Sequence, residues 1–152
     1  MKESFYWARY TWALLHILCN NIKEEYFAEE IENIKRIIFG IFTNLPCPDC
    51  KQHATRFLHK SRDFRTIKNK PELINFIFNF HNIVNKRIGK RIRNSDILSQ
   101  YNNIPLIYIA NNWYKYFRIY HIDQYSIREE CERTKFKQLL LNYLKAKHDR
   151  FI

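Results

Sequence analysis

Apolar side chains recur at helical spacing along almost the whole chain, and this period constrains the fold more than any other feature of the sequence. In residues 26–42, for example, Phe27, Ile31, Ile34 and Ile38 follow one stripe of a helix. The 152 residues include only two glycines and four prolines, which argues against a β-sandwich. We therefore predict an all-α fold, with helices over residues 5–20, 26–42, 50–59, 71–88, 106–120 and 126–147, and a polar loop over 60–70.

A Cys-x-x-Cys pair, Cys47 and Cys50, immediately precedes the third of these helical patterns. The partial positive charge at a helix N-terminus lowers the pKa of a thiol and favours the reactive thiolate. A thioredoxin-like motif would need flanking strands, and a purely structural disulfide would gain little because it closes so short a loop. A zinc site is a further alternative, in which His53 and His59 would complete a tetrahedron with the two cysteines.

The first helical pattern carries Arg9, Trp12, His16 and Cys19 on one stripe. One interpretation is an ordinary amphipathic helix whose Trp packs and whose His finds a local partner. The functional interpretation is a surface that binds a planar, phosphate-bearing ligand, because Trp offers a flat face and Arg pairs well with phosphate oxygens.

The helix predicted after Pro71 carries His81, Asn82 and Asn85 close to its C-terminal end. Burying an unpaired polar group costs about 1–3 kcal/mol, so these side chains need partners. A basic cluster follows at the helix end, where the dipole favours cations, and consists of Lys86, Arg87, Lys90, Arg91 and Arg93. A solvated helix end would explain the charges but not the His and Asn residues.

Three segments together carry a resemblance to a known family. They are Arg-Tyr-Thr-Trp-Ala-Leu-Leu-His at residues 9–16, Pro-Cys-Pro-Asp-Cys at 46–50, and His-Asn-Ile-Val-Asn at 81–85 followed by Gly89-Lys90. In this order they resemble the Erv/ALR family of FAD-linked sulfhydryl oxidases, over about residues 5–101. The small size and the Asn, Ile and Lys content resemble the single-domain enzymes of large DNA viruses.

The resemblance implies a four-helix bundle plus a short fifth helix, which would bind FAD at the mouth of the bundle. We expect an FAD-binding domain at residues 1–103, a helical C-terminal extension at 104–152, and a homodimer. Cys50 would lie nearest the flavin and Cys47 would be attacked by the substrate thiolate. The residues expected to contact FAD are Arg9, Trp12, His16, His81, Asn82, Asn85, Lys90 and Tyr101, and no metal is expected.

The activity implied is oxidation of thiols to disulfides in protein substrates, with electrons passing through the Cys-x-x-Cys to FAD and then to molecular oxygen, which gives hydrogen peroxide. A thioredoxin-like protein or a small dithiol carrier is the expected partner. In a virus this would be a late protein, in the host cytoplasm or the virion; otherwise we expect it in the cytosol. No apolar run approaches the roughly 18 residues of a membrane span, and the N-terminus does not resemble a signal peptide, so we expect neither membrane insertion nor secretion.

Two other classes of protein remain as alternatives. The net charge of +11 also suits a basic helical module, with or without a stabilising zinc ion, that binds nucleic acid through residues 86–93 and the C-terminal aromatic residues. A degenerate family member that binds FAD only structurally is the other alternative, but the intact Cys-x-x-Cys argues against it.

The sequence departs from the cellular members of the family in its cysteines. Cellular members commonly have a Cys just before the third motif, where this chain has Phe78, and they also carry a shuttle Cys pair on a flexible tail. Neither feature is present here. We expect Cys19 to be a buried thiol and Cys131 to be exposed, as a shuttle, an intermolecular link or an incidental surface thiol.

The last fifty residues lie outside the resemblance. Ser126 and Glu129 match a capping box that would open the final helix. The expected buried side of that helix is Phe136, Leu139, Leu140, Tyr143 and Leu144. We expect the extension to pack on the bundle, enlarge a dimer interface or dock a substrate protein.

Overall fold

The computed structural model describes residues 5–152 and confirms the all-α fold. Residues 1–4 lie outside the described residues. The expectations for the start of segment 1–103 and for the absence of a signal peptide fall partly on them. Seven α-helices and three short 3₁₀ segments follow one another along this part of the chain. They are α1 (Tyr6–Asn21), η2 (Glu24–Tyr26), α2 (Phe27–Thr43), α3 (Pro48–Lys60), α4 (Arg62–Thr66), α5 (Lys70–Arg87), η3 (Ser95–Tyr101), α6 (Leu106–Tyr116), α7 (Ile127–Ala146) and η4 (His148–Arg150).

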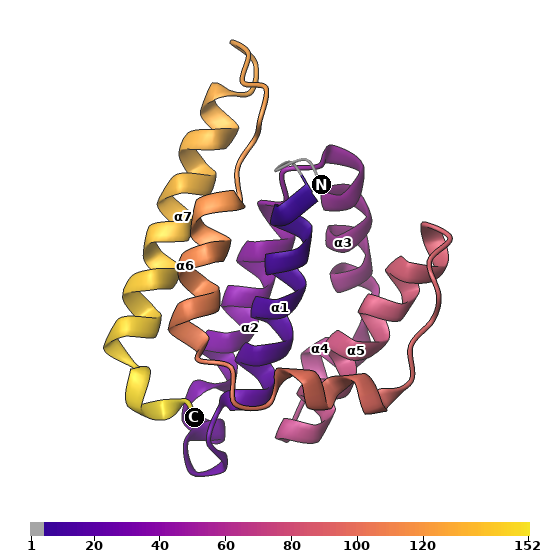
Figure 1. Ribbon diagram of the computed structural model, residues 1–152, viewed down its shortest axis with the longest axis vertical. Coiled ribbons are helices and arrows are strands. Elements are labelled where there is room, and N and C mark those ends of the chain that lie inside the picture. The colour runs from indigo at the N-terminus through magenta and orange to yellow at the C-terminus, as the bar shows by residue number, and fades with distance from the viewer. Residues whose placement is uncertain (1–4) are drawn as a thin grey trace.

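Helix α1 lies in the middle of the molecule, with α6 and α7 on one side of it and α3, α4 and α5 on the other (Figure 1). Its C-terminal half is buried, and Leu14, Ile17 and Leu18 are almost completely excluded from solvent. Helices α1, α2, α3 and α5 form the expected bundle, and η3 crosses one end of it as the short fifth segment. Trp113 and Phe117, from α6 and the residue that caps it, extend the same hydrophobic core into the C-terminal extension.

The start and end of α5 follow rules that are readable in the sequence. At its N-terminus the Asn69 side chain accepts a hydrogen bond from the backbone N–H of Glu72, at 2.9 Å. At its C-terminus Gly89 has a φ of +74°, in the left-handed region where glycine is preferred. This turn lets the Lys90 N–H donate to the Asn85 carbonyl at 2.8 Å, which ends the helix in a Schellman motif.

Four details of the predicted elements are wrong. Residues 60–70 are not all loop, because Ser61 caps the short helix α4 by accepting from the Phe64 N–H. Helix α6 ends at Tyr116 rather than near 120. The capping box does not form: Ser126 precedes α7 as predicted, but its hydroxyl bonds the backbone of Asp123 instead. Leu139 is exposed, whereas Leu140 and Leu144 are buried as expected.

The C-terminal end of the chain is tied to the turn between α1 and α2. The Ile152 N–H donates to the Asn21 carbonyl at 2.8 Å, and the Lys23 N–H donates to the Arg150 carbonyl at 3.0 Å. Beside this turn the buried Glu30 carboxylate accepts a hydrogen bond from the Tyr143 hydroxyl of α7 at 2.5 Å. The extension is therefore anchored at its far end as well as along its length.

Helix α7 approaches α2 closely at Gly40, and this contact yields a prediction. A Cβ atom at Gly40 would come within 2.1 Å of the Phe136 ring, so Gly40→Ala requires that ring to move. Alanine normally stabilises a helix interior by about 1 kcal/mol relative to glycine, whereas overpacking costs about 1–3 kcal/mol. Because three atoms of the ring lie within 2.8 Å of the added Cβ, the cost falls at the upper end of this range. We expect Gly40→Ala to lower the free energy of unfolding by about 1–2 kcal/mol, measured by urea denaturation.

The control for this prediction shortens the side chain that would collide. Phe136→Leu in the Gly40→Ala background should recover part of the lost stability, because the smaller side chain leaves room for the new methyl group. A Gly40→Ala protein as stable as the wild type, or more stable, would contradict the close approach of α7 and α2.

Candidate functional site

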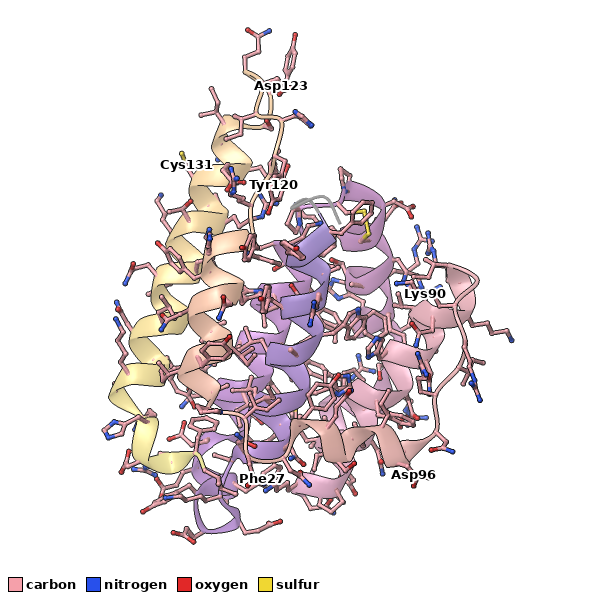
Figure 2. The ribbon with its side chains drawn as sticks, in the orientation of Figure 1. Phe27, Lys90, Asp96, Tyr120, Asp123 and Cys131 are labelled. Carbon is pink, nitrogen blue, oxygen red and sulfur yellow. A yellow bond between two sulfur atoms is a disulfide. The ribbon has the colours of Figure 1, made fainter. Side chains whose placement is uncertain are left out.

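The Cys pair lies at the start of α3 and is oxidised. Cys47 and Cys50 form a disulfide with their Cα atoms 5.2 Å apart, drawn as a yellow bond in Figure 2. Cys47 is the N-cap of α3, and its sulfur accepts a hydrogen bond from the Cys50 N–H at 3.3 Å, with Pro48 in the first turn. Cys50 packs against the hydrophobic core. Both sulfurs thus lie where backbone N–H groups of the first helical turn favour negative charge.

Four predicted residues from three elements form one stack of rings. Trp12 of α1 lies flat against His81 of α5, with 3.8 Å between ring centroids and 4° between planes. His16, one turn further along α1, stacks on Tyr101 of η3 at 4.7 Å and 15°. A hydrogen bond of 2.8 Å between His16 Nε2 and His81 Nδ1 joins the two halves of the stack.

Both histidines are neutral at physiological pH. Burial, reinforced by the neighbouring His81, lowers the pKa of His16 from 6.5 to about 3. Burial and then the charge of Lys90 lower the pKa of His81 from 6.5 to about 4. A neutral imidazole has one donor and one acceptor nitrogen, so one ring donates to the other in the hydrogen bond that links them.

The two predicted asparagines lie beside this stack. Asn82 makes two hydrogen bonds to the backbone of Arg93, accepting from its N–H at 2.9 Å and donating to its carbonyl at 2.8 Å. Asn85 is buried, and both asparagines line a small cavity of about 20 Å³ together with His16, His81 and Tyr101. The paired hydrogen bonds of Asn82 fold the basic segment after α5 back along its own helix.

A chain of aromatic contacts leads from α3, the helix that begins at the disulfide, to the stack. His53, one turn after Cys50 on α3, stacks on Phe80 at 5.9 Å. Phe80 in turn contacts Trp12 at 5.7 Å. Burial, followed by the charge of Arg87, lowers the pKa of His53 below its ordinary value, so His53 offers no fixed positive charge to a nearby thiolate at neutral pH.

Arg9 and Lys90 do not join this cluster. Arg9 is exposed on α1, one turn before Trp12, and outside the cavity lining. Lys90 is exposed in the turn after α5 and outside the cavity lining, although its charge acts on His81. Of the remaining basic cluster, Arg87 pairs with Asp49, between the two cysteines, at 2.8 Å.

Several residues at the site have no sequence signal for a role there. The helical period of residues 71–88 predicts only that Phe80 is buried, yet Phe80 contacts Trp12, Phe42, His53 and Phe57. Phe78, Arg93 and Ile97 line the small cavity. The helical period shows that Phe80 is buried, but no local signal indicates which rings it meets across the bundle.

The zinc alternative finds no support in the described residues. Among residues 5–152, no three His, Cys, Asp or Glu side chains come close enough together to hold a metal ion. The two cysteines are bonded to each other, His53 packs on Phe80, and His59 is exposed. A separate groove of about 680 Å³ between α3, α4 and α5 contains none of the predicted site residues.

Comparison with known proteins identifies the family. The sequence description of the Erv1/Alr family matches residues 9–103, which is more than half of the chain. The chain belongs to the Erv1/Alr family. An FAD-linked sulfhydryl oxidase of African swine fever virus (a Kenyan isolate) is 34% identical over 105 residues, which cover 65% of this chain and 79% of the viral protein. No solved structure gives a significant match.

Two further viral relatives match part of the chain. The 096R protein of Invertebrate iridescent virus 3 is 29% identical over 84 residues, which cover 55% of this chain and 57% of that protein. A Malawi isolate of African swine fever virus has an FAD-linked sulfhydryl oxidase that is 30% identical over 99 residues, covering 79% of its length. The family match ends at residue 103, so α6 and α7 lie beyond it.

The groups at this site suit the cofactor that the family resemblance implies. FAD combines flat heteroaromatic rings with a pyrophosphate. The described residues offer flat faces from Trp12, His81 and Tyr101, amide groups from Asn82 and Asn85, and exposed cations after α5. Flat rings match a purine by stacking, and the cations match phosphate oxygens.

None of the helices in residues 5–152 combines the length and the apolar character that crossing a bilayer requires.

The neutral histidine pair yields a prediction about acid stability. Unfolded histidines bind protons with a pKa near 6.5, whereas His16 and His81 in the folded protein do so only near 3 and 4. The unfolded state therefore binds more protons as the pH falls below 6.5, and folding stability is lost. The full shifts would lower the free energy of unfolding by roughly 4 kcal/mol from pH 7 to pH 5. Because His81 is only partly buried and solvent screens its charge, we expect a fall of about 2–3 kcal/mol, measured by urea denaturation.

A matched pair of variants separates this pair from other histidines. His16→Gln should remove part of the dependence on pH, because it deletes one buried imidazole. His121→Gln changes an exposed residue between α6 and α7 and should keep the full dependence. Equal stability of the wild type at pH 7 and pH 5 would contradict the neutral, buried histidine pair.

Proposed function

We propose that this protein is an FAD-linked sulfhydryl oxidase that forms disulfide bonds in protein substrates. The observation that carries the proposal is the Cys47–Cys50 disulfide at the start of α3, the helix whose His53 leads through Phe80 to the ring stack. The family membership and the names of the African swine fever virus relatives support it.

The two cysteines take different roles in this proposal. Cys47, at the N-cap, is the sulfur that a substrate thiolate attacks, which breaks the Cys47–Cys50 bond and forms a mixed disulfide. A second substrate thiol then displaces Cys47, so that the substrate leaves as a disulfide and the pair remains as a dithiol. Cys50 packs against the hydrophobic core one helical turn before His53, which supports its assignment as the sulfur nearer the cofactor.

Bound FAD would accept two electrons from the dithiol and deliver them to molecular oxygen, giving hydrogen peroxide. We propose that the stack residues Trp12, His16, His81 and Tyr101 bind its flat rings, that Asn82 and Asn85 bond its polar edges, and that Arg9 and Lys90 pair with its phosphates. The lowered pKa values of His16 and His81 support this arrangement, since a neutral imidazole can accept as well as donate a hydrogen bond.

The substrates we propose are protein thiols, presented by a thioredoxin-like protein or a small dithiol carrier. The viral relatives support a location in the host cytoplasm or the virion.

We propose that the FAD-binding segment ends at residue 103 and that the C-terminal extension begins at residue 104. The extension does not fold as a separate unit in this proposal, because its Trp113 and Phe117 are buried in the same hydrophobic cluster as Leu14 of α1.

The oxidase proposal predicts a flavin spectrum and a loss of turnover in one variant. The purified protein should show the visible absorption of bound flavin and consume oxygen with a dithiol substrate. Cys50→Ser should reduce turnover by roughly three orders of magnitude or more while the flavin stays bound, because the pair can no longer be reoxidised. Cys131→Ser, an exposed thiol away from the pair, is the matched control and should turn over a small dithiol normally.

A second variant tests the ring stack. Trp12→Ala should weaken FAD binding about 10- to 100-fold, because one aromatic stacking contact contributes roughly 1–3 kcal/mol. A protein that binds no FAD even after reconstitution would overturn the proposed function. So would a Cys50→Ser protein with full activity.

We also propose that the protein is a homodimer, on the basis of the family resemblance. Light scattering on the purified protein should then give twice the 18.8 kDa mass of one chain. A mass equal to one chain at micromolar concentration would reject the dimer without affecting the oxidase proposal.

A further inference from the structure

The fully buried Arg133 of α7 reaches across to the segment that leads into the Cys pair. Its Nε donates to the Asn44 carbonyl at 2.5 Å, and its Nη2 donates to the Leu45 carbonyl at 3.2 Å. These two carbonyls belong to residues three and two positions before Cys47. Arg133 lies 30 residues beyond the end of the family match, so it is outside the segment that this chain shares with the family description.

The rest of the Arg133 guanidinium is held by its own helix. Glu130 accepts from Nη1 at 2.5 Å, and Glu129 accepts from Nη2 at 3.0 Å. Because the guanidinium is planar and its donors are fixed, four simultaneous hydrogen bonds define its position closely. The two backbone carbonyls are thereby fixed relative to α7.

A second contact from the same turn of α7 reaches the other side of the pair. Glu129 forms an ion pair at 3.5 Å with Lys51, the residue directly after Cys50. This pair is partly exposed and weak on its own. Helix α7 therefore contacts the chain both before Cys47 and after Cys50.

The effect of this contact on the pair is geometric rather than electrostatic. Arg133 and Lys51 bring two positive charges, and Glu129 and Glu130 bring two negative charges, so the charges of these four side chains cancel. A neutral cluster has little influence on a thiolate a few residues away. The hydrogen bonds, in contrast, limit the positions that Cys47 can take once its bond to Cys50 is broken.

We propose that Arg133 is a positioning residue that holds residues 44–46 so that Cys47 stays within bonding distance of Cys50 in the dithiol state. Holding two thiols together raises their effective concentration and favours the disulfide. This role of Arg133 rests on the proposed function in one respect, which is that the Cys47–Cys50 pair is oxidised and reduced during turnover.

The test is the equilibrium of the pair with glutathione, measured anaerobically on the full chain by thiol trapping and mass spectrometry. Two glutathione thiols become one glutathione disulfide while the Cys47–Cys50 disulfide becomes two thiols, so atoms and electrons balance without oxygen. Arg133→Lys keeps the charge but cannot bond both carbonyls in the same way. We expect it to favour the dithiol about three- to tenfold, and tenfold corresponds to ~30 mV for this two-electron couple.

The matched control is Lys137→Met, on the same helix. Lys137 is also buried and cationic, and it interacts electrostatically with Glu130 and Arg133, but its hydrogen bond goes to the Tyr114 carbonyl of α6 at 3.0 Å and not to residues 44–46. Its loss should lower the free energy of unfolding but leave the glutathione equilibrium within twofold of the wild type. An equal shift in both variants would mean that general loosening of α7 moves the equilibrium, and that result would overturn the positioning role.

No shift in a folded Arg133→Lys protein would also overturn the proposal. If that variant does not fold, Glu129→Gln replaces it, because Glu129 is partly exposed and bonds both Arg133 and Lys51. A shift of about two- to threefold toward the dithiol is then expected, from weakening one charged hydrogen bond, and no shift overturns the proposal. Failure of the oxidase proposal appears separately, as a wild-type protein without flavin or oxygen consumption whose disulfide still equilibrates with glutathione.

Discussion

The hydrogen bond between His16 and His81 is the interaction on which the candidate site depends. It joins α1 to α5 in the interior, and the rings of Trp12 and Tyr101 stack on its two sides. If both imidazoles were charged, neither nitrogen of the pair could accept the hydrogen bond, and even one charged imidazole would lose solvation in the interior. Burial therefore selects the neutral form of both rings, and neutral rings in turn keep the two helices at the distance the site requires.

Most of the fold could be predicted from the sequence, because the apolar period is strong and the helix ends carry local signals. The period predicted α1, α2 and α5 to within one or two residues at most ends, and Pro71 and Gly89 lie at the two ends of α5. The errors have particular causes. Asp123 competes successfully for the Ser126 hydroxyl, and Phe64 packs against Phe76, which favours a helix in a segment that reads as a polar loop.

Less of the site could be predicted, because its contacts join residues that are distant in sequence. The motifs indicated Trp12, His16, His81 and Tyr101, and the structure brings these four together. They did not indicate the bond from Asn82 to the backbone of Arg93, the central place of Phe80, or the reach of Arg133 to Asn44, which spans 89 positions. The Asn82–Arg93 bond arises from the turn after α5, and the Arg133–Asn44 bond arises because the extension packs on the bundle. Neither contact produces a periodic pattern in the sequence.

The four cysteines of the chain occupy three different chemical settings. Cys47 and Cys50 are bonded to each other, Cys19 is a buried thiol whose pKa is raised by burial, and Cys131 is an exposed thiol on the outer side of α7 (Figure 2). A maleimide dye applied to the folded, oxidised protein should therefore attach at Cys131 alone. The chain thus carries a natural labelling position on α7, from which fluorescence could follow how the extension moves when the Cys pair is reduced.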